Sequence, residues 1–231
     1  MNHRLTKETL KLASLHLARQ HKDLARILEK HGTPPLWARQ PGFPTLLQII
    51  LEQQVSLRAA QSMFLRLKNA TVPFTPERFL ALGETHLKGL GLTRQKTAYC
   101  LHLSDSIVTQ RLSLASLSRL SDDDVRTRLM EVKGIGLWSA DIYLLMALRR
   151  PDVWPAGDLA LAIAATKIRK RQIRLSPEEL SRVAARWRPF RSVAARILWH
   201  YYLCERNGKS SQAVINQRLT CVETKPSWYR F

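Results

Sequence analysis

The sequence LMEVKGIGLWSAD, residues 129–141, places two glycines between two segments of helical character. We expect a first helix to end at Val132, because Val132 continues the apolar spacing of the residues before it. A second helix is predicted to begin near Leu137. The residues between, 132–137, then form a tight turn, and this pair of helices with its turn is the best-defined local feature of the chain.

The turn is suited to binding an anion. Glycine has no Cβ, so Gly134 and Gly136 can adopt positive φ and allow close approach of another molecule to the backbone. Their N–H groups, at the start of the second helix, form a site suited to one phosphate, and Lys133 supplies positive charge nearby. A turn of this composition by itself indicates binding weakly, because many such turns only connect helices.

An aspartate, Asp158, follows Trp138 by twenty residues, at the end of the loop sequence PDVWPAG. Taken alone, Asp158 is best interpreted as the N-cap of a helix that begins at Leu159, since aspartate is among the preferred caps. A catalytic carboxylate is the alternative, and the spacing from the glycine turn favours it.

The rest of the chain predicts an all-α fold. Ser121, Ser56, Thr75 and Ser176 are expected N-caps, the last two with proline at the first helical position, and two short helices are expected before Gly32. No segment alternates apolar and polar residues as a half-buried strand would.

Proline- and glycine-rich breaks, at residues 32–44 and 150–157, divide the chain of 231 residues. The predicted parts are a central helical lobe of residues 41–151 that carries the turn, a second lobe of residues 1–40 plus 152–204, and a polar C-terminal tail of residues 205–231.

Composition narrows the class of partner. The chain holds 37 Lys+Arg and 18 Asp+Glu, a formal charge of +19 with pI near 10.7, and this favours nucleic acid over a merely soluble basic surface. Three widely spaced cysteines predict neither a disulfide framework nor a zinc or iron–sulfur site. Since no apolar run is long enough to span a bilayer and the N-terminus is polar, we expect a soluble, intracellular protein that is not secreted.

Three further matches accompany the turn and Asp158. ILEQQVS at residues 50–56, WRPFRSVA at residues 187–194 and Trp138 after the turn complete a pattern over residues 41–204 that resembles the helix-hairpin-helix DNA glycosylases. The similarity is to their alkylpurine branch, which includes 3-methyladenine DNA glycosylase II, in a compact form without an N-terminal β domain. It implies two helical lobes with the active site in the cleft between them.

The resemblance also implies roles for particular residues. Asp158 is the implied catalytic carboxylate. The implied base pocket consists of Trp138, Trp199, Tyr143 and Phe43. The implied DNA contacts are Lys133, Gly134, Ile135, Gly136, Ser139, Arg191 and Ser192, with Ser192 also an expected helix cap. The candidates for the side chain that fills the space of the extruded base are Gln54 and Gln53, and an equally weighted alternative is that both only satisfy carbonyls at their own helix end.

No cofactor is implied as required, although the backbone carbonyls of Met130, Val132 and Ile135 are implied ligands of a structural Na⁺ or K⁺. Trp138 stands where members with lyase activity carry lysine, which implies a monofunctional enzyme that hydrolyses the glycosidic bond of alkylated purines in duplex DNA and leaves an abasic site. We expect a monomer in the cytoplasm or nucleoid of a bacterium, or in a eukaryotic nucleus.

Three alternatives stay open on the sequence. Ile142, at a pocket position often occupied by tyrosine, leaves room for a catalytically weak protein that binds damaged or abasic DNA. The others are a glycosylase for deaminated or mismatched bases and a structural basic protein that uses the turn only to hold DNA.

Overall fold

The computed structural model of the protein describes residues 4–211, and every regular element in that range is an α-helix. The all-α prediction is therefore confirmed for these residues. Within the same range, no helix combines the length and the apolar character that a membrane crossing requires.

The described residues form two compact units. Unit 1 contains residues 4–37 and 149–211, and unit 2 contains residues 38–148. The chain passes from one unit to the other after Trp37 and after Leu148, where the sequence predicted lobe boundaries after residues 40 and 151.

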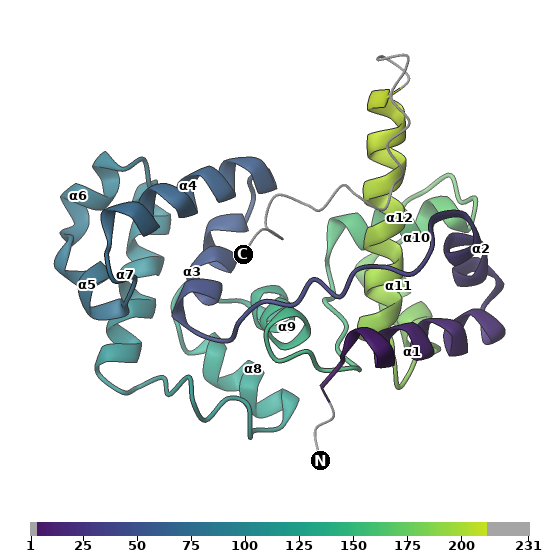
Figure 1. Cartoon of the computed structure of the whole chain (residues 1–231), viewed down its shortest axis with the longest axis horizontal. Helices are drawn as coiled ribbons and strands as arrows, with labels where there is room; N and C mark the ends of the chain where they lie inside the picture. The colour runs from purple at the N-terminus through teal and green to yellow at the C-terminus, as the bar shows by residue number, and fades with distance from the viewer. Residues whose placement is uncertain (1–3, 212–231) are drawn as a thin grey trace. The chain divides into compact units, whose positions relative to one another are not determined.

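Unit 1 is built around its longest helix, α12. This helix contacts α1, α2, α10 and α11, and Figure 1 shows it in yellow-green with α2 and α10 beside it. Leu198 and Ile197 of α12 are fully buried at this centre. The helices of unit 1 are α1 (Lys7–Gln20), α2 (Lys22–His31), α10 (Leu159–Ile168), α11 (Pro177–Ala185) and α12 (Arg191–Ser211).

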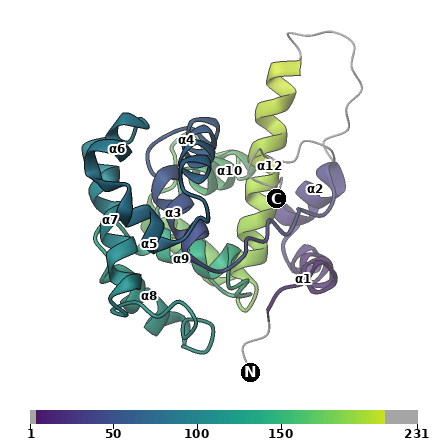
Figure 2. The same ribbon diagram turned by 60° about the vertical axis from the view of Figure 1, so that its left-hand side comes forward.

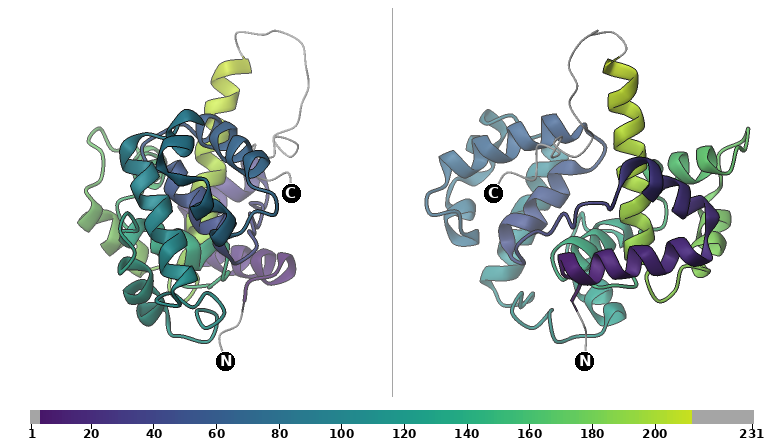
Figure 3. Two further views of the ribbon diagram at one scale, coloured as in Figure 1. Left: turned by 90° about the vertical axis from the view of Figure 1, so that its left-hand side faces the viewer. Right: turned by 45° about the vertical axis from the view of Figure 1, so that its right-hand side comes forward.

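Unit 2 is organised on α3 and α7. Helix α7 contacts α3, α5 and α6, while α3 also contacts α4 and α9, and α8 packs on α9. Figure 2 shows α5 and α6 beside α7, and the right-hand view of Figure 3 shows the α3 and α4 segments from another side. The helices of unit 2 are α3 (Phe43–Glu52), α4 (Leu57–Ala70), α5 (Pro76–Ala81), α6 (Gly83–Gly89), α7 (Arg94–Val108), α8 (Asp122–Met130) and α9 (Leu137–Met146).

Four of the helix starts predicted from a hydroxyl cap are confirmed. Ser56, Thr75 and Ser121 each accept a backbone N–H three residues ahead. Ser176 does the same and completes a capping box with Glu179. These hydrogen bonds satisfy N–H groups that the first turn of a helix leaves without a partner, which is why they can be predicted locally.

Two predicted helix ends are wrong. Helix α8 ends at Met130 and not at Val132, because the Val132 carbonyl accepts the N–H of Ile135 and closes the turn instead. Helix α12 runs to Ser211, so the first seven residues of the predicted tail are helical. The prediction placed the end of the helix at the change to polar residues, but polar residues can continue a helix. Here Glu205, within the predicted tail, accepts hydrogen bonds from Lys30 of α2 and Lys167 of α10. The remainder of that tail, residues 212–231, lies outside the described residues.

Candidate functional site

The turn between α8 and α9 contains a position that only glycine fits. Gly134 has a φ of +93°, and a Cβ placed on it would lie 2.2 Å from Cγ of Tyr99 on α7. The Tyr99 hydroxyl in turn accepts a hydrogen bond from Gln95. The backbone of Gly134 therefore packs directly on the ring of Tyr99. The two residues are 35 positions apart in the sequence, and this contact was not predicted from the sequence.

The start of α9 has a glycine at its N-cap. Gly136 is its N-cap and is exposed, and no side chain of the described residues caps this helix end. Lys133 is exposed, while its backbone N–H donates to Nδ1 of His102. A helix N-terminus without a side-chain cap retains N–H groups for an outside acceptor, so this geometry is suited to an anion.

Gln53 links the end of α3 to the turn. Its Nε2 donates to the carbonyl of Gly134 at 2.8 Å and to Oγ of Ser139 at 2.9 Å. Gln53 thus holds the turn in place instead of satisfying carbonyls of its own helix, and that part of the alternative interpretation is wrong. Ser139 is only 3% exposed, so its hydroxyl serves this link in the interior. The side chain of Ile135 is buried as well.

Gln54 differs from its neighbour. It is exposed and has a φ of +58°, in the loop between α3 and α4. Val55, which follows it, is also exposed. The structure therefore places Gln54 at an exposed position of this loop, and its predicted role in filling the space of an extruded base stays a prediction.

A buried ion pair lies at the same end of α3. Nη2 of Arg39 donates to both carboxylate oxygens of Glu52, at 2.9 and 3.1 Å, and both side chains are almost fully buried. Burial raises the pKa of Glu52, and Arg39 opposes that rise. Nζ of Lys96 donates to the carbonyl of Leu51 in the same turn of helix. Glu52 precedes Gln53 in the sequence, but nothing local indicated its partner.

Asp158 occupies the N-cap of α10 in unit 1. Its Oδ1 accepts the backbone N–H of Leu161 at 2.9 Å, so the capping interpretation is correct. The same oxygen accepts the indole N–H of Trp199 at 3.2 Å, and the residue is 8% exposed. The N–H groups of Leu161 and Trp199 hold Oδ1 of the carboxylate, and its negative charge lies at the positive end of the α10 dipole. A cap and a functional carboxylate are therefore compatible here.

The aromatic candidates fall into different environments. Trp199 is buried beside Asp158, and Trp37, which the sequence did not single out, meets it edge to face at 6.4 Å. Trp138 is partly exposed on α9. Phe43 packs against Phe74 and Phe79 in the interior of unit 2.

Tyr143 is also an interior residue. It has no exposed surface, its hydroxyl accepts the N–H of Gly42 at 3.2 Å, and burial raises its pKa to about 12. Because Phe43 and Tyr143 both contribute to the core of unit 2, the structure does not support either as a surface that stacks on a base.

Arg191 and Ser192 have structural roles in unit 1. The Arg191 guanidinium donates to both carboxylate oxygens and to the carbonyl of Asp152. Ser192 is fully buried, and its hydroxyl accepts from the N–H of Val153 and donates to the Val153 carbonyl. The capping prediction for Ser192 is wrong, since α12 begins one residue earlier, and its hydroxyl is not available to a phosphate.

The three carbonyls predicted to hold Na⁺ or K⁺ belong to Met130, Val132 and Ile135. The Val132 carbonyl accepts the N–H of Ile135 at 3.0 Å, and a carbonyl has a second lone pair for a cation. Oxygen donors of this kind suit an alkali cation, and the cation site stays a prediction. Among residues 4–211, no three His, Cys, Asp or Glu side chains gather as a metal site would require.

Known proteins resemble this chain in sequence over most of its length. The profile of the HhH-GPD superfamily base excision DNA repair proteins matches residues 47–189, more than half of the chain. YfjP of Bacillus subtilis is 26% identical over 185 residues, which cover 76% of this chain and 64% of YfjP. DNA-3-methyladenine glycosylase 1 of Schizosaccharomyces pombe is 25% identical over 203 residues, covering 84% of this chain and 86% of that protein.

A solved structure shares the fold. The 3-methyladenine DNA glycosylase of Schizosaccharomyces pombe in complex with abasic DNA superimposes with a TM-score of 0.72 at 21% identity. The superposition covers 89% of this chain and 99% of that chain.

Proposed function

The chain belongs to the HhH-GPD superfamily of base excision DNA repair proteins, and we propose that it hydrolyses the N-glycosidic bond of alkylated purines in duplex DNA. The observation that carries the proposal is the carboxylate of Asp158, held by the N–H groups of Leu161 and Trp199 at the start of α10. Relatives named as DNA-3-methyladenine glycosylases support the substrate class.

Hydrolysis of this glycosidic bond requires mainly a negatively charged group close to the sugar. A 3-methyladenine or 7-methylguanine base is cationic and is already a good leaving group, so a strong general acid is not needed. As the glycosidic bond breaks, positive charge develops on the sugar, and a carboxylate stabilises it and orients the attacking water. Extrusion of the base from the duplex costs a few kcal/mol, and it costs least for a damaged base.

Recognition of the base is assigned to the partly exposed face of Trp138. A cation over an aromatic face gains up to about 2 kcal/mol when desolvated. Trp138 offers no amine, so water is the expected nucleophile and the product is an abasic site. Borohydride reduction of the protein with abasic DNA is then expected to trap no covalent adduct.

The decisive test compares wild type with Asp158→Asn on methylated duplex DNA. Asparagine is an equally good N-cap and keeps an oxygen for the N–H groups of Leu161 and Trp199, while it removes the negative charge and replaces the second carboxylate oxygen by an amide NH2 group. We expect the variant to bind DNA as wild type does and to release 3-methyladenine and 7-methylguanine at least about 100-fold more slowly.

The matched control is Asp105→Asn, which removes a half-exposed carboxylate of unit 2 that pairs with Arg111. It is expected to leave release unchanged. Binding without release by wild type would instead support a protein that only recognises damaged DNA or another lesion. Equal release by wild type and Asp158→Asn would show that a different carboxylate acts.

A further inference from the structure

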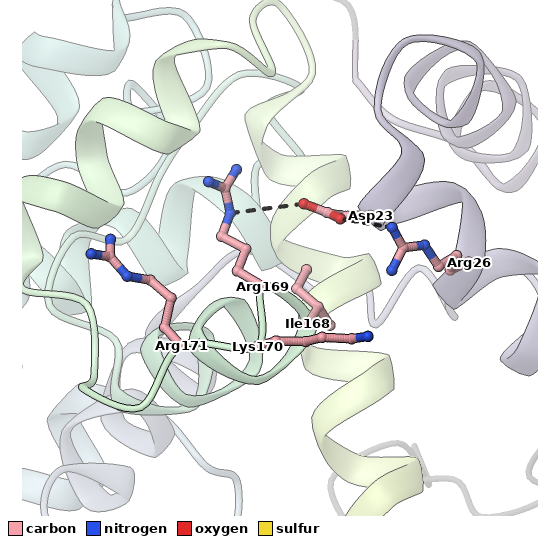
Figure 4. Close-up of a pocket in the computed structure, with 6 residues that line it drawn as sticks. All are labelled: Asp23, Arg26, Ile168, Arg169, Lys170 and Arg171. Carbon is pink, nitrogen blue, oxygen red and sulfur yellow. Dashed lines mark ion pairs between the residues drawn. The ribbon is translucent and has the colours of Figure 1, made fainter.

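Unit 1 contains a pocket that the proposed chemistry does not use. It has a volume of about 440 Å³ and opens between the first turns of α2 and the segment that follows α10. Figure 4 shows the side chains that line it: Asp23, Arg26, Ile168, Arg169, Lys170 and Arg171.

The pocket holds more positive charge than its acid can neutralise. Asp23 lies between two guanidinium groups, as Figure 4 shows, with 3.7 Å to Nη2 of Arg26 and 3.9 Å to Nε of Arg169. Both separations are longer than a hydrogen bond. Nε of Arg169 is buried and has no hydrogen-bond acceptor among residues 4–211. Arg171 reaches a second acid, Glu179, only at 3.6 Å.

The neighbourhood of the pocket is positive as well. Burial lowers the pKa of His21, and the positive charges of Arg186 and Arg169 lower it further. Residues 149–231 hold 17 Lys+Arg and 6 Asp+Glu, a net charge of 17 − 6 = +11 out of the +19 of the chain.

The pocket is separate from the carboxylate that the proposed function uses. Asp158 caps the N-terminus of α10, while Ile168 and Arg169 lie at the other end of this ten-residue helix. At 1.5 Å of rise per residue the two ends are about 15 Å apart. A ligand of this pocket therefore binds away from Asp158.

We propose that this pocket binds a phosphate of the DNA backbone, as an anchor additional to the turn between α8 and α9. Arginine and lysine donors left without good acceptors are the groups that bind phosphate oxygens. The Arg26 side chain is 63% exposed and that of Arg171 is 55% exposed, so the donors reach a group carried on a large ligand. None of the lining side chains is aromatic, so a free nucleotide gains no stacking for its base.

Asp23 has an opposing role in this site. Its carboxylate occupies the space between Arg26 and Arg169 that a phosphate oxygen takes when DNA binds. Removing that negative charge while keeping the side-chain size is therefore expected to strengthen DNA binding.

The experiment measures the affinity for an undamaged duplex by fluorescence anisotropy at several salt concentrations. Arg26→Gln/Lys170→Gln is expected to weaken binding roughly tenfold at about 0.1 M salt and to lower the slope of log affinity against log salt by about one. Asp23→Asn is expected to tighten binding about threefold. The control Lys7→Gln/Arg119→Gln removes one lysine and one arginine from exposed positions outside the pocket and is expected to change neither quantity.

Other outcomes overturn the assignment. Equal weakening by the control pair would attribute the effect to general charge. Binding of inorganic phosphate by wild type but not by Arg26→Gln/Lys170→Gln, with duplex affinity unchanged between them, would assign the pocket to a small phosphorylated ligand. Unchanged affinity for both probes would leave the pocket without a phosphate role.

The assignment of this pocket as a phosphate anchor depends on the proposed function in one respect, which is that DNA is the ligand. Because the duplex is undamaged, binding is measured without any base release. If wild type fails to release a methylated purine but the pocket variants change affinity as expected, the glycosylase proposal fails and the anchor stands. If release is normal and the variants bind as wild type, only the anchor fails.

Discussion

At the scale of single residues, Gly134 shows how one contact sets the identity of a position. Replacement by alanine would place Cβ 2.2 Å from the Tyr99 ring at a φ of +93°. Overpacking and backbone strain together predict a loss of about 3 kcal/mol in the free energy of unfolding, measured by chemical denaturation. The neighbouring Gly136→Ala is the control, because its φ is −96° and, apart from its chain neighbours, no atom of the described residues lies within 4 Å of the added methyl group.

Gly136→Ala is expected to change stability by less than about 0.5 kcal/mol. Adding Tyr99→Ala to Gly134→Ala separates the two causes, since the clash disappears while the positive φ remains. Equal effects of Gly134→Ala and Gly136→Ala would refute the packing explanation.

At the scale of elements, Gln53 is the side chain that ties α3 to the turn before α9. Gln53→Met keeps most of the volume but removes both donations, to the Gly134 carbonyl and to Ser139. The Gly134 carbonyl and the Ser139 hydroxyl would then each lack a hydrogen-bond donor in a part-buried place. We therefore expect the free energy of unfolding to fall by about 2 kcal/mol. Gln54→Met is the matched control one residue away, exposed and expected to be neutral. A loss of similar size in both variants would contradict this role for Gln53.

Glu205 joins three helices of unit 1 and predicts a pH dependence. Lys167 of α10 and Lys30 of α2 donate to its carboxylate, and these bonds lower its pKa to about 2, from an ordinary value of 4.5. A lowered pKa in the folded state stabilises the fold above pH 4.5, and this contribution is lost as the pH falls toward about 2.

Glu205→Gln is therefore expected to lose up to about 1 kcal/mol at neutral pH, because the ion pairs are partly exposed. The difference from wild type should shrink as thermal melts are repeated at lower pH. Glu29→Gln, an exposed glutamate of α2, is expected to match wild type throughout. A difference that grew on acidification would have the wrong sign.

At the scale of the whole molecule, the formal charge of +19 predicts steeply salt-dependent binding to any duplex. Each neutralised phosphate releases a counterion, so several contacts together predict a loss of at least about 100-fold in affinity between 50 and 200 mM salt. Isothermal titration or anisotropy with undamaged DNA measures the slope directly. An affinity independent of salt would exclude the electrostatic binding that the composition predicts.

Local sequence signals were sufficient for part of the helical pattern. Caps such as Ser176 and Ser121 and apolar spacing at 3.6 residues depend on neighbours a few positions away, so several helix starts and the glycine turn could be located from residues alone. Asp158 could be chosen as the candidate carboxylate for the same reason, since its distance from the glycine turn is read directly from the sequence. The limits of α8 and α12 were misplaced because a turn bond and ion pairs to other helices decided them.

What the sequence by itself determined is thus the all-α class, the position of the turn and the carboxylate that caps α10. Only the tertiary structure decided that Tyr99 closes on Gly134, that Gln53 bonds a carbonyl 81 residues away, and that Ser192 is an interior group. It also placed Asp23 against Arg169. The physical reason is that hydrogen bonds within a turn of helix follow from sequence spacing, whereas burial and long-range contacts depend on which helix faces pack together.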